Sequence, residues 1–308
     1  MSRPLAKIEA SSRRLPDWLR KSVAPGLEAV RTDTLLKEQG LHTICESGRC
    51  PNRNECYSQK TATFMILGDV CTRSCGFCSV STGRPDALDR DEPRRVAEAA
   101  RTLGLQHVVV TSVNRDDMKD EGADHFAQVI RELRRLSTEL VIEILTPDFK
   151  RTQGAAVETI LSAGPDIFSH NTETVPRLYR PVRPQGDYSK SLQIFREIRS
   201  RSERMLTKSG LMLGLGETHR EVFAVLQDLR SVGCDILTLG QYLQSSTAGV
   251  AVSEYVRPEE FAVYKEEAFR MGFTWVESGP FVRSSFHAKE SFESLKASLK
   301  ARKLEPVS

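Results

Sequence analysis

The sequence predicts an α/β fold: an open, partial (β/α)6 barrel of the TIM type, with N-terminal and C-terminal extensions that cover its open face. From residue 61 onward, short apolar runs alternate with segments of helical periodicity. This alternation gives six β–α units of roughly 30–40 residues, which indicates a parallel sheet with right-handed crossovers. A closed eight-stranded barrel needs two more units than the sequence provides, and a doubly wound sheet is the alternative architecture.

Each element is predicted from its own pattern. Strands are expected at apolar runs bounded by turn residues, namely residues 62–68, 107–112, 140–145, 166–170, 210–215 and 235–242. Helices are expected where apolar residues recur at three-to-four spacing, namely residues 92–103, 124–136, 152–163, 189–201, 218–232 and 258–271. Glycines that favour a left-handed cap follow several of these helices, namely Gly104, Gly164, Gly233 and Gly272.

The chain is predicted to divide into three parts. Residues 1–60 form an irregular N-terminal extension with short helical pieces such as residues 33–39, residues 61–256 form the barrel, and residues 257–308 form a C-terminal extension. Functional groups of such sheets collect at the carboxyl ends of the strands. The polar residues that follow several predicted strands are therefore candidate site residues.

The composition is that of an ordinary globular protein. Its 308 residues include 44 basic and 41 acidic residues that are well mixed, with a net charge of +3, which argues against binding to nucleic acid. No apolar run approaches the roughly 18 residues of a membrane span. The start of the chain also lacks the apolar run of a secretory signal. We therefore expect a cytoplasmic protein whose cysteines are kept as thiols.

Six of the seven cysteines form two consecutive trios with different spacing. The C-x4-C-x5-C trio is Cys45, Cys50 and Cys56, and the C-x3-C-x2-C trio is Cys71, Cys75 and Cys78. A trio is one ligand short of the four thiolates that complete a structural zinc site or an ordinary iron–sulfur site. The two trios therefore predict two clusters, each with one metal corner held by something other than cysteine. Cys234 precedes a predicted strand and is interpreted as a core residue.

The second trio lies directly after the first predicted strand of the barrel. Thiolates at this spacing can bind three irons of a cubane and leave the fourth exposed. The head group of S-adenosylmethionine can chelate that iron, and one electron then splits its sulfonium to give an adenosyl radical. The spacing, with Phe77 directly before Cys78, resembles the radical S-adenosylmethionine superfamily. The alternative is a zinc knuckle completed by a distant His, although no His lies at the usual ligand spacing downstream.

The first trio, paired with Arg283-Ser284-Ser285-Phe286, resembles the lipoyl synthase family. The resemblance covers nearly the whole chain. Further matching segments are residues 16–19, 111–117, 146–149, 170–175, 208–218 and 239–242. The sequence departs from the commonest family pattern at Gly76, where Pro is common, and at Phe286, where Tyr is usual.

The resemblance implies an enzyme that acts on an octanoyl group attached by an amide to a lysine of a lipoyl carrier domain. That carrier would be a 2-oxoacid dehydrogenase E2 or a glycine cleavage H protein. Adenosyl radicals would remove hydrogen at C6 and then at C8, and an auxiliary [4Fe–4S] cluster would be consumed as the source of both sulfur atoms. The implied cofactors are two [4Fe–4S] clusters and S-adenosylmethionine, with an electron donor such as ferredoxin or flavodoxin.

The resemblance also implies roles for site residues. The second trio would hold the radical-generating cluster, and the first trio with Ser285 would hold the auxiliary cluster, Ser284 being the alternative ligand. A serine alkoxide matches iron less well than a thiolate does, so it should leave readily as the cluster is dismantled. Residues expected to contact S-adenosylmethionine are Phe77, Asn114, Asn171, Glu173, Gly214, Gly216 and Glu217.

Several alternatives stay open from the sequence. Gly214 to Glu217 also fits a plain strand-to-helix turn, and Asp116 and Asp117 are expected to cap the following helix. A different radical enzyme, such as a methylthiotransferase or a biotin-synthase-like sulfur inserter, would share the second trio. It should not pair the first trio with Arg-Ser-Ser-Phe. A non-catalytic iron–sulfur or zinc scaffold is the third possibility.

Overall fold

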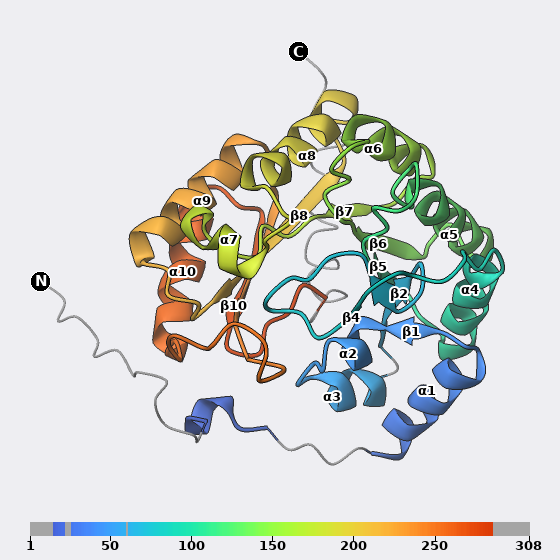
Figure 1. The fold of residues 1–308 in the computed structure, drawn as a ribbon, viewed down its shortest axis with the longest axis horizontal. Coiled ribbons are helices and arrows are strands. Elements are labelled where there is room, and N and C mark those ends of the chain that lie inside the picture. Colours follow the sequence, from blue (N-terminus) through green and yellow to red (C-terminus); the bar gives the residue numbers. More distant parts are fainter. Residues whose placement is uncertain (1–14, 22–25, 60, 286–308) are drawn as a thin grey trace, which may run out of the picture.

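The computed structural model describes residues 15–21, 26–59 and 61–285, and it shows a curved sheet surrounded by helices (Figure 1). The main sheet has the strand order β1-β2-β5-β6-β7-β8-β9-β10. Its strands are β1 (His42–Thr43), β2 (Thr63–Ile66), β5 (His107–Ser112), β6 (Val141–Leu145), β7 (Ile167–Ser169), β8 (Leu206–Leu213), β9 (Ile236–Gln241) and β10 (Trp275–Gly279). All neighbours are parallel except β1, which runs antiparallel to β2.

This strand order distinguishes the two predicted architectures. The strands follow one another in sequence order, whereas a doubly wound sheet reverses its order at a switch point. Over the described ranges, β1 and β10 stand at the two ends of the sheet and do not pair with each other. The prediction of an open, partial TIM-type barrel is therefore confirmed.

The outer ring of helices follows the predicted periodicity closely. The helices α4 (Glu92–Leu103), α5 (Ala123–Leu136), α6 (Gln153–Ser162), α8 (Tyr188–Arg201), α9 (His219–Ser231) and α10 (Pro258–Arg270) lie outside the sheet (Figure 1). In α9, Thr218 and Glu221 form a reciprocal capping box that fixes the first turn. The glycines expected to end helices do adopt a left-handed conformation, as at Gly104 and Gly233.

The residues before the barrel fold into a small helical layer beside β2. This layer contains η1 (Asp17–Leu19), α1 (Leu27–Glu38), α2 (Ile44–Ser47) and α3 (Arg53–Ser58). The buried Tyr57 ties it together: its hydroxyl lies 2.7 Å from Thr43 Oγ1, and its carbonyl accepts a hydrogen bond of 2.9 Å from Thr32 Oγ1. Because β1 pairs with β2, the layer brings the first cysteine trio to the edge of the barrel.

Shorter elements lie in the loops that follow the barrel strands. They are β3 (Val70–Cys71) and β4 (Ser81–Thr82), which pair with each other, and η2 (Pro176–Leu178) and α7 (Tyr179–Val182). At the opposite end, the sheet interior is filled by a small apolar cluster of Val141, Ile167, Leu206 and Ile236, with Trp275 packed against it. No helix in the described part of the chain is long and apolar enough to cross a membrane.

The two-residue strands β1, β3 and β4 were not predicted, and two longer strands also differ from the sequence prediction. β8 begins at Leu206 rather than at residue 210, because Lys208 interrupts the apolar pattern while lying inside the barrel. There its Nζ is 2.8 Å from Oε1 of the equally buried Glu143. β10 was missed, because Glu277 and Ser278 break the alternation of a strand that nevertheless pairs with β9 along its whole length.

Candidate active site

The second cysteine trio surrounds one point at the carboxyl end of the barrel. Burial raises the pKa of the Cys75 thiol to about 12; the nearby Arg183 lowers it, and Cys78 and Cys71 raise it further. Burial also raises the pKa of Cys78, with Cys71 and Glu173 acting in the same direction. Because Cys71 acts on both Cys75 and Cys78, and Cys78 acts on Cys75, the three side chains lie close together.

Backbone donors hold this cysteine loop in place. The amides of Arg73 and Asn114 point at Cys71 Sγ, at 3.4 and 3.3 Å. The amide of Gly76 donates a hydrogen bond of 2.9 Å to the Val182 carbonyl, which a proline at this position could not do. Phe77, expected near the cofactor, packs against an apolar cluster that contains Val182.

The first trio also converges, between α2 and α3. Burial raises the pKa of Cys45 to about 11, with Cys50 adding to the rise and hydrogen bonds with Thr63 opposing it. Burial raises the pKa of Cys56 to about 12, and both Cys45 and Cys50 add to it. Burial favours neutral thiols here, even though Lys21 acts to lower the pKa of Cys56. A metal centre is therefore what would make these groups good thiolate ligands.

The structure separates the two neighbouring serines of the C-terminal motif. Ser285 Oγ accepts a hydrogen bond of 2.8 Å from Thr63 Oγ1, and Thr63 also contacts Cys45, so Ser285 lies beside the first trio. Ser284 Oγ instead accepts a hydrogen bond of 2.8 Å from Asn171 Nδ2, at the end of β7. Ser285 is therefore the serine next to these cysteines.

The segment that carries these serines enters the barrel beside β9. The Asn52 amide donates a hydrogen bond of 2.7 Å to the Phe281 carbonyl, and the Lys21 ammonium lies 5.1 Å from the centre of the Phe281 ring. A Cβ added to Gly240 would lie only 2.1 Å from the Val282 carbonyl oxygen. Arg283 is close enough to Cys50 for the thiolate to oppose the lowering of its pKa by burial.

Two of the residues expected to bind S-adenosylmethionine, Asn171 and Glu173, follow the end of β7. Asn171 is buried, and its Oδ1 has no hydrogen-bond partner among the described residues, so it is an acceptor suited to a donor on a ligand. Glu173 has a left-handed backbone, with φ of 68°, and burial raises its pKa while Arg183 lowers it. The charge of Glu173 acts on Cys75 and Cys78, and the Asn171 carbonyl accepts a hydrogen bond of 2.9 Å from Arg183, which also acts on Cys75. Both residues therefore belong to the surroundings of the second trio.

The turn from Gly214 to Glu217 is folded back on itself. The Glu217 carboxylate accepts a hydrogen bond of 2.9 Å from the Leu215 amide, and burial raises its pKa. A Cβ on Gly214 would lie 2.3 Å from the Glu254 carbonyl oxygen, whereas one on Gly216 would lie 3.3 Å from Ser253 Oγ. These contacts explain the turn by packing, which is the alternative left open by the sequence. Contact of this turn with the cofactor stays a prediction.

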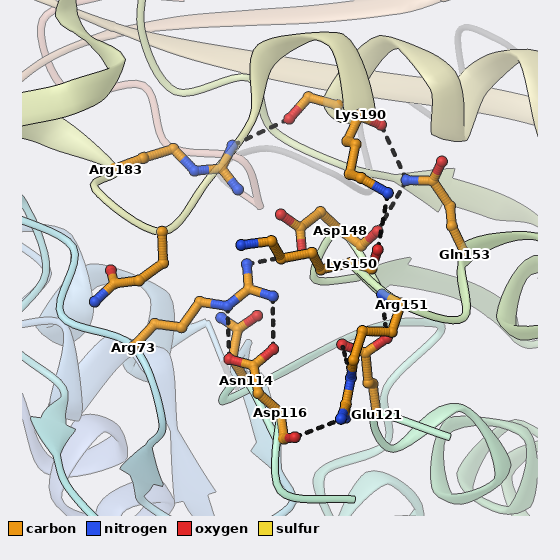
Figure 2. A network of polar contacts seen from close by, with 12 residues as sticks. Arg73, Asn114, Asp116, Glu121, Asp148, Lys150, Arg151, Gln153, Arg183 and Lys190 are labelled. Carbon is orange, nitrogen blue, oxygen red and sulfur yellow. Dashed lines mark hydrogen bonds and ion pairs between the residues drawn. The ribbon is translucent and has the colours of Figure 1, made fainter. Parts of the chain in front are cut away.

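Sequence reasoning missed a buried charge network beside the second trio (Figure 2). Arg73 binds Asp116 and also Asp148, which follows β6. Asp116 and Asp117 were expected to cap the next helix, but they pair with Arg73 and Arg115 instead. The signal available in the sequence was an arginine inside the cysteine loop, without any indication of its partners.

The donor chemistry fits iron–sulfur clusters. Two convergent sets of soft sulfur ligands, each with an additional oxygen or nitrogen group nearby, are typical of such sites. Among the described residues, no three His, Cys, Asp or Glu side chains lie close enough to hold a single metal ion. Thiolates that wrap a cubane bind different irons, so they are spaced more widely than the ligands of one ion.

Comparison with known proteins agrees with this chemistry. Residues 65–229 match the family model described as the radical SAM superfamily. Lipoyl synthase from Caldanaerobacter subterraneus subsp. tengcongensis is 50% identical over 275 residues, which are 89% of this chain and 96% of that protein. Lipoyl synthase from Rubrobacter xylanophilus is 51% identical over 278 residues, which are 90% of this chain and 86% of that protein.

Solved structures support the fold alone, since their identities are low. Methylornithine synthase superposes with a TM-score of 0.53 at 14% identity, covering 92% of this chain and 94% of that chain. The FeFe-hydrogenase maturase HydG from Carboxydothermus hydrogenoformans superposes with a TM-score of 0.56 at 12% identity, covering 88% and 78%. The sequence relatives and the family model show that this chain belongs to the lipoyl synthase family of the radical SAM superfamily.

Proposed function

We propose that this protein inserts two sulfur atoms, at C6 and C8, into an octanoyl group that is amide-linked to a lysine of a lipoyl carrier domain. One observation carries the proposal: a chain of contacts joins the two cysteine trios across the barrel mouth. Glu173 lies beside Cys75 and Cys78, and Asn171, two residues earlier, binds Ser284. The adjacent Ser285 binds Thr63, which contacts Cys45. These contacts support the proposal that one acyl chain reaches both groups.

Lipoyl synthases of the radical SAM superfamily use two [4Fe–4S] clusters and S-adenosylmethionine. In this chain Cys71, Cys75 and Cys78 would hold the first cluster. When bound, this cluster and S-adenosylmethionine supply hydrogen-atom abstraction from unactivated carbon. Asn171 would offer its buried side-chain oxygen as a hydrogen-bond acceptor for the cofactor. The backbone amide of Asn114 contacts Cys71 Sγ, which would place Asn114 beside the same cluster. The protein's part is to orient these groups and keep water away from the radical.

The auxiliary cluster is a substrate in this proposal, because its sulfur ends in the product. Cys45, Cys50, Cys56 and Ser285 would hold it. Three thiolates retain the iron, whereas a serine oxygen is the weakest of the four ligands and would be released first. Arg283, which lies near Cys50, adds positive charge on the side where an alkoxide would form.

The partners follow from the same reaction. The carrier would be a 2-oxoacid dehydrogenase E2 domain or a glycine cleavage H protein, and a ferredoxin or flavodoxin would deliver electrons. We place the protein in the cytoplasm, where a reducing environment keeps six thiols available for clusters. We also propose that residues 1–60 and 257–308 act as extensions of the barrel of residues 61–256. The first would bring the first trio to the barrel, and the second, after it adds α10 and β10 to the barrel edge, would bring Ser285 there.

Mass spectrometry of an octanoylated carrier peptide after anaerobic turnover tests the proposal. The wild-type protein should add two sulfur atoms, and Cys45→Ala should still form 5′-deoxyadenosine but add no sulfur. Cys75→Ala should lose both activities. Cys234→Ala is the matched control, because Cys234 is buried just before β9, where its thiol contacts the carbonyls of Thr207 and Ile236 at the amino ends of the strands. Sulfur insertion by Cys45→Ala, or modification of tRNA or dethiobiotin instead of the carrier, would exclude this function.

A further inference from the structure

We propose that Arg73 and Asp148 form a buried clamp that orients the second cysteine trio against the strand-end loops, and so positions Cys71 and Asn114 for S-adenosylmethionine. The inference rests on the proposed function and deepens it. It assigns a positioning role to two residues outside the cysteines and the cofactor contacts. Neither residue is required to touch the cofactor for this role.

Arg73 lies in the cysteine loop, and all three nitrogens of its guanidinium contact carboxylates. It is 5% exposed, and Nε and Nη2 bind the two carboxylate oxygens of Asp116 at 2.8 and 2.7 Å. Its third nitrogen, Nη1, lies 2.7 Å from Asp148 Oδ1 (Figure 2). A planar fork that is held by two carboxylates fixes its own orientation, which a flexible lysine ammonium would not do.

Asp148 is the more deeply buried partner. It is 0% exposed and follows β6 in a loop where the next residue, Phe149, has a φ of 44°. A carboxylate without access to water requires a cation, because removing one member of a buried ion pair leaves an uncompensated charge. Arg73 is the guanidinium within ion-pair distance, and Arg183 is a second positive charge close enough to interact with Asp148.

The clamp is connected by hydrogen bonds to both Cys71 and Asn114. Thr72, next to Arg73, donates hydrogen bonds to the Asn114 carbonyl through its amide and its hydroxyl, each at 3.1 Å. Its hydroxyl also binds Asp116 Oδ2 at 2.9 Å, and the Asn114 amide lies 3.3 Å from Cys71 Sγ. A rotation of the Arg73 backbone would therefore move Cys71 and Asn114 relative to each other.

The test compares Asp148→Asn with the wild-type holoenzyme. Asparagine keeps the shape but removes the charge that holds Arg73 to the β6 loop. We expect both clusters to load, with about eight irons per chain. We expect the KM for S-adenosylmethionine to rise about tenfold, as for the loss of one charge-assisted contact. We also expect the electron paramagnetic resonance signal of the reduced cluster to lose the change that S-adenosylmethionine causes in the wild type.

Two further variants separate positioning from general destabilisation. Arg73→Lys should fall between the wild type and Arg73→Met in both readouts. Arg134→Met is the matched control: Arg134 Nη2 lies 2.7 Å from Asp166 Oδ2, at the amino ends of β6 and β7. It removes an ion pair of similar length and should leave the KM and the spectrum unchanged.

Defined results would overturn the inference. A wild-type KM and spectral change in Asp148→Asn would do so, as would the same losses in Arg134→Met. If Asp148→Asn does not fold, Arg73→Lys decides the question with the same two readouts, and wild-type values there reject the clamp. Failure of the wild-type protein to cleave S-adenosylmethionine would instead reject the proposed function, so the two failures are distinguishable.

Discussion

Replacing Gly240 by alanine should remove the auxiliary cluster while sparing cleavage of S-adenosylmethionine. The added Cβ would lie 2.1 Å from the Val282 carbonyl oxygen and 3.3 Å from Arg283 Nη1. Because the clash involves backbone, the segment from Val282 to Ser285 must move by about 1 Å, a displacement that can cost about 100-fold in rate at a reacting site. Overpacking of this kind also costs about 1–3 kcal/mol of folding stability.

The assay measures iron, cofactor cleavage and sulfur insertion on the same reconstituted sample. We expect Gly240→Ala to fall from about eight to about four irons per chain and to lose lipoyl product. We expect it to keep its 5′-deoxyadenosine formation. Gly279→Ala is the matched control, since Gly279 pairs with Gly240 but its added Cβ would meet Val282 Cγ2 at 3.5 Å, an ordinary contact. A Gly240→Ala protein with both clusters and normal product would refute the argument.

Three further predictions concern the loop, the barrel interior and the serine ligand. Gly76→Ala should lower cofactor cleavage by at least about tenfold and lower the melting temperature, because its Cβ would lie 2.7 Å from the Pro181 carbonyl oxygen. Glu143→Gln should destabilise the protein at pH 7 by about 3 kcal/mol in denaturant unfolding, because it leaves Lys208 buried without its partner. Ser285→Cys should keep the iron of the auxiliary cluster yet slow sulfur insertion by about tenfold, because a thiolate leaves iron less readily.

The Glu143 prediction also has a pH dependence with a definite sign. Burial acts to raise the pKa of Glu143, but the charge of Lys208 and the contact with His107 lower it to about 2, from an ordinary value of 4.5. The stabilisation is therefore present above pH 4.5 and is lost as the pH falls toward 2. Acid unfolding followed by tryptophan fluorescence should show this dependence in the wild type, and its persistence in Glu143→Gln would contradict the assignment.

The other two predictions have equally direct contradictions. Normal cofactor cleavage in Gly76→Ala would contradict the prediction, because it would show that a methyl group fits between Gly76, Pro181 and Val250. Normal sulfur insertion in Ser285→Cys, together with lost insertion in Ser284→Ala, would move the ligand to Ser284. The expected result for Ser284→Ala is loss of the hydrogen bond from Asn171 alone, with product still formed.

Much of the fold was predictable because helices and buried parallel strands have strong local patterns. The helix at residues 92–103 has the bounds of α4, and the strand at residues 107–112 has those of β5. β8 and β10 were harder, because polar residues interrupt their apolar patterns. Lys208 pairs with the buried Glu143, 65 positions away, whereas Glu277 is partly buried and accepts a hydrogen bond from Trp275 Nε1. A buried ion pair such as that of Lys208 removes the apolar signal without removing the strand.

The site was predictable where its chemistry is local. Cysteine spacing specified both trios, whereas the partners of Arg73 come from loops after two different strands. The choice between Ser284 and Ser285 also depended on the third dimension, because it rests on whether Thr63 or Asn171 is the neighbour. Side chains that meet only through strand order leave no spacing rule for a sequence to reveal.

The long reach of the C-terminal segment sets an order of assembly. The hydrogen bond from Asn52 to Phe281 joins residues 229 positions apart, while the second trio closes within a loop of a few residues. Closing a long loop costs more entropy than closing a short one, and the ribosome delivers Phe281 only after every preceding strand. Because Ser285 follows Phe281, the proposed auxiliary site can gain its serine only after translation has passed β10. The cysteines of both trios are synthesised well before that point, so Ser285 is the last of the proposed cluster ligands to reach its place.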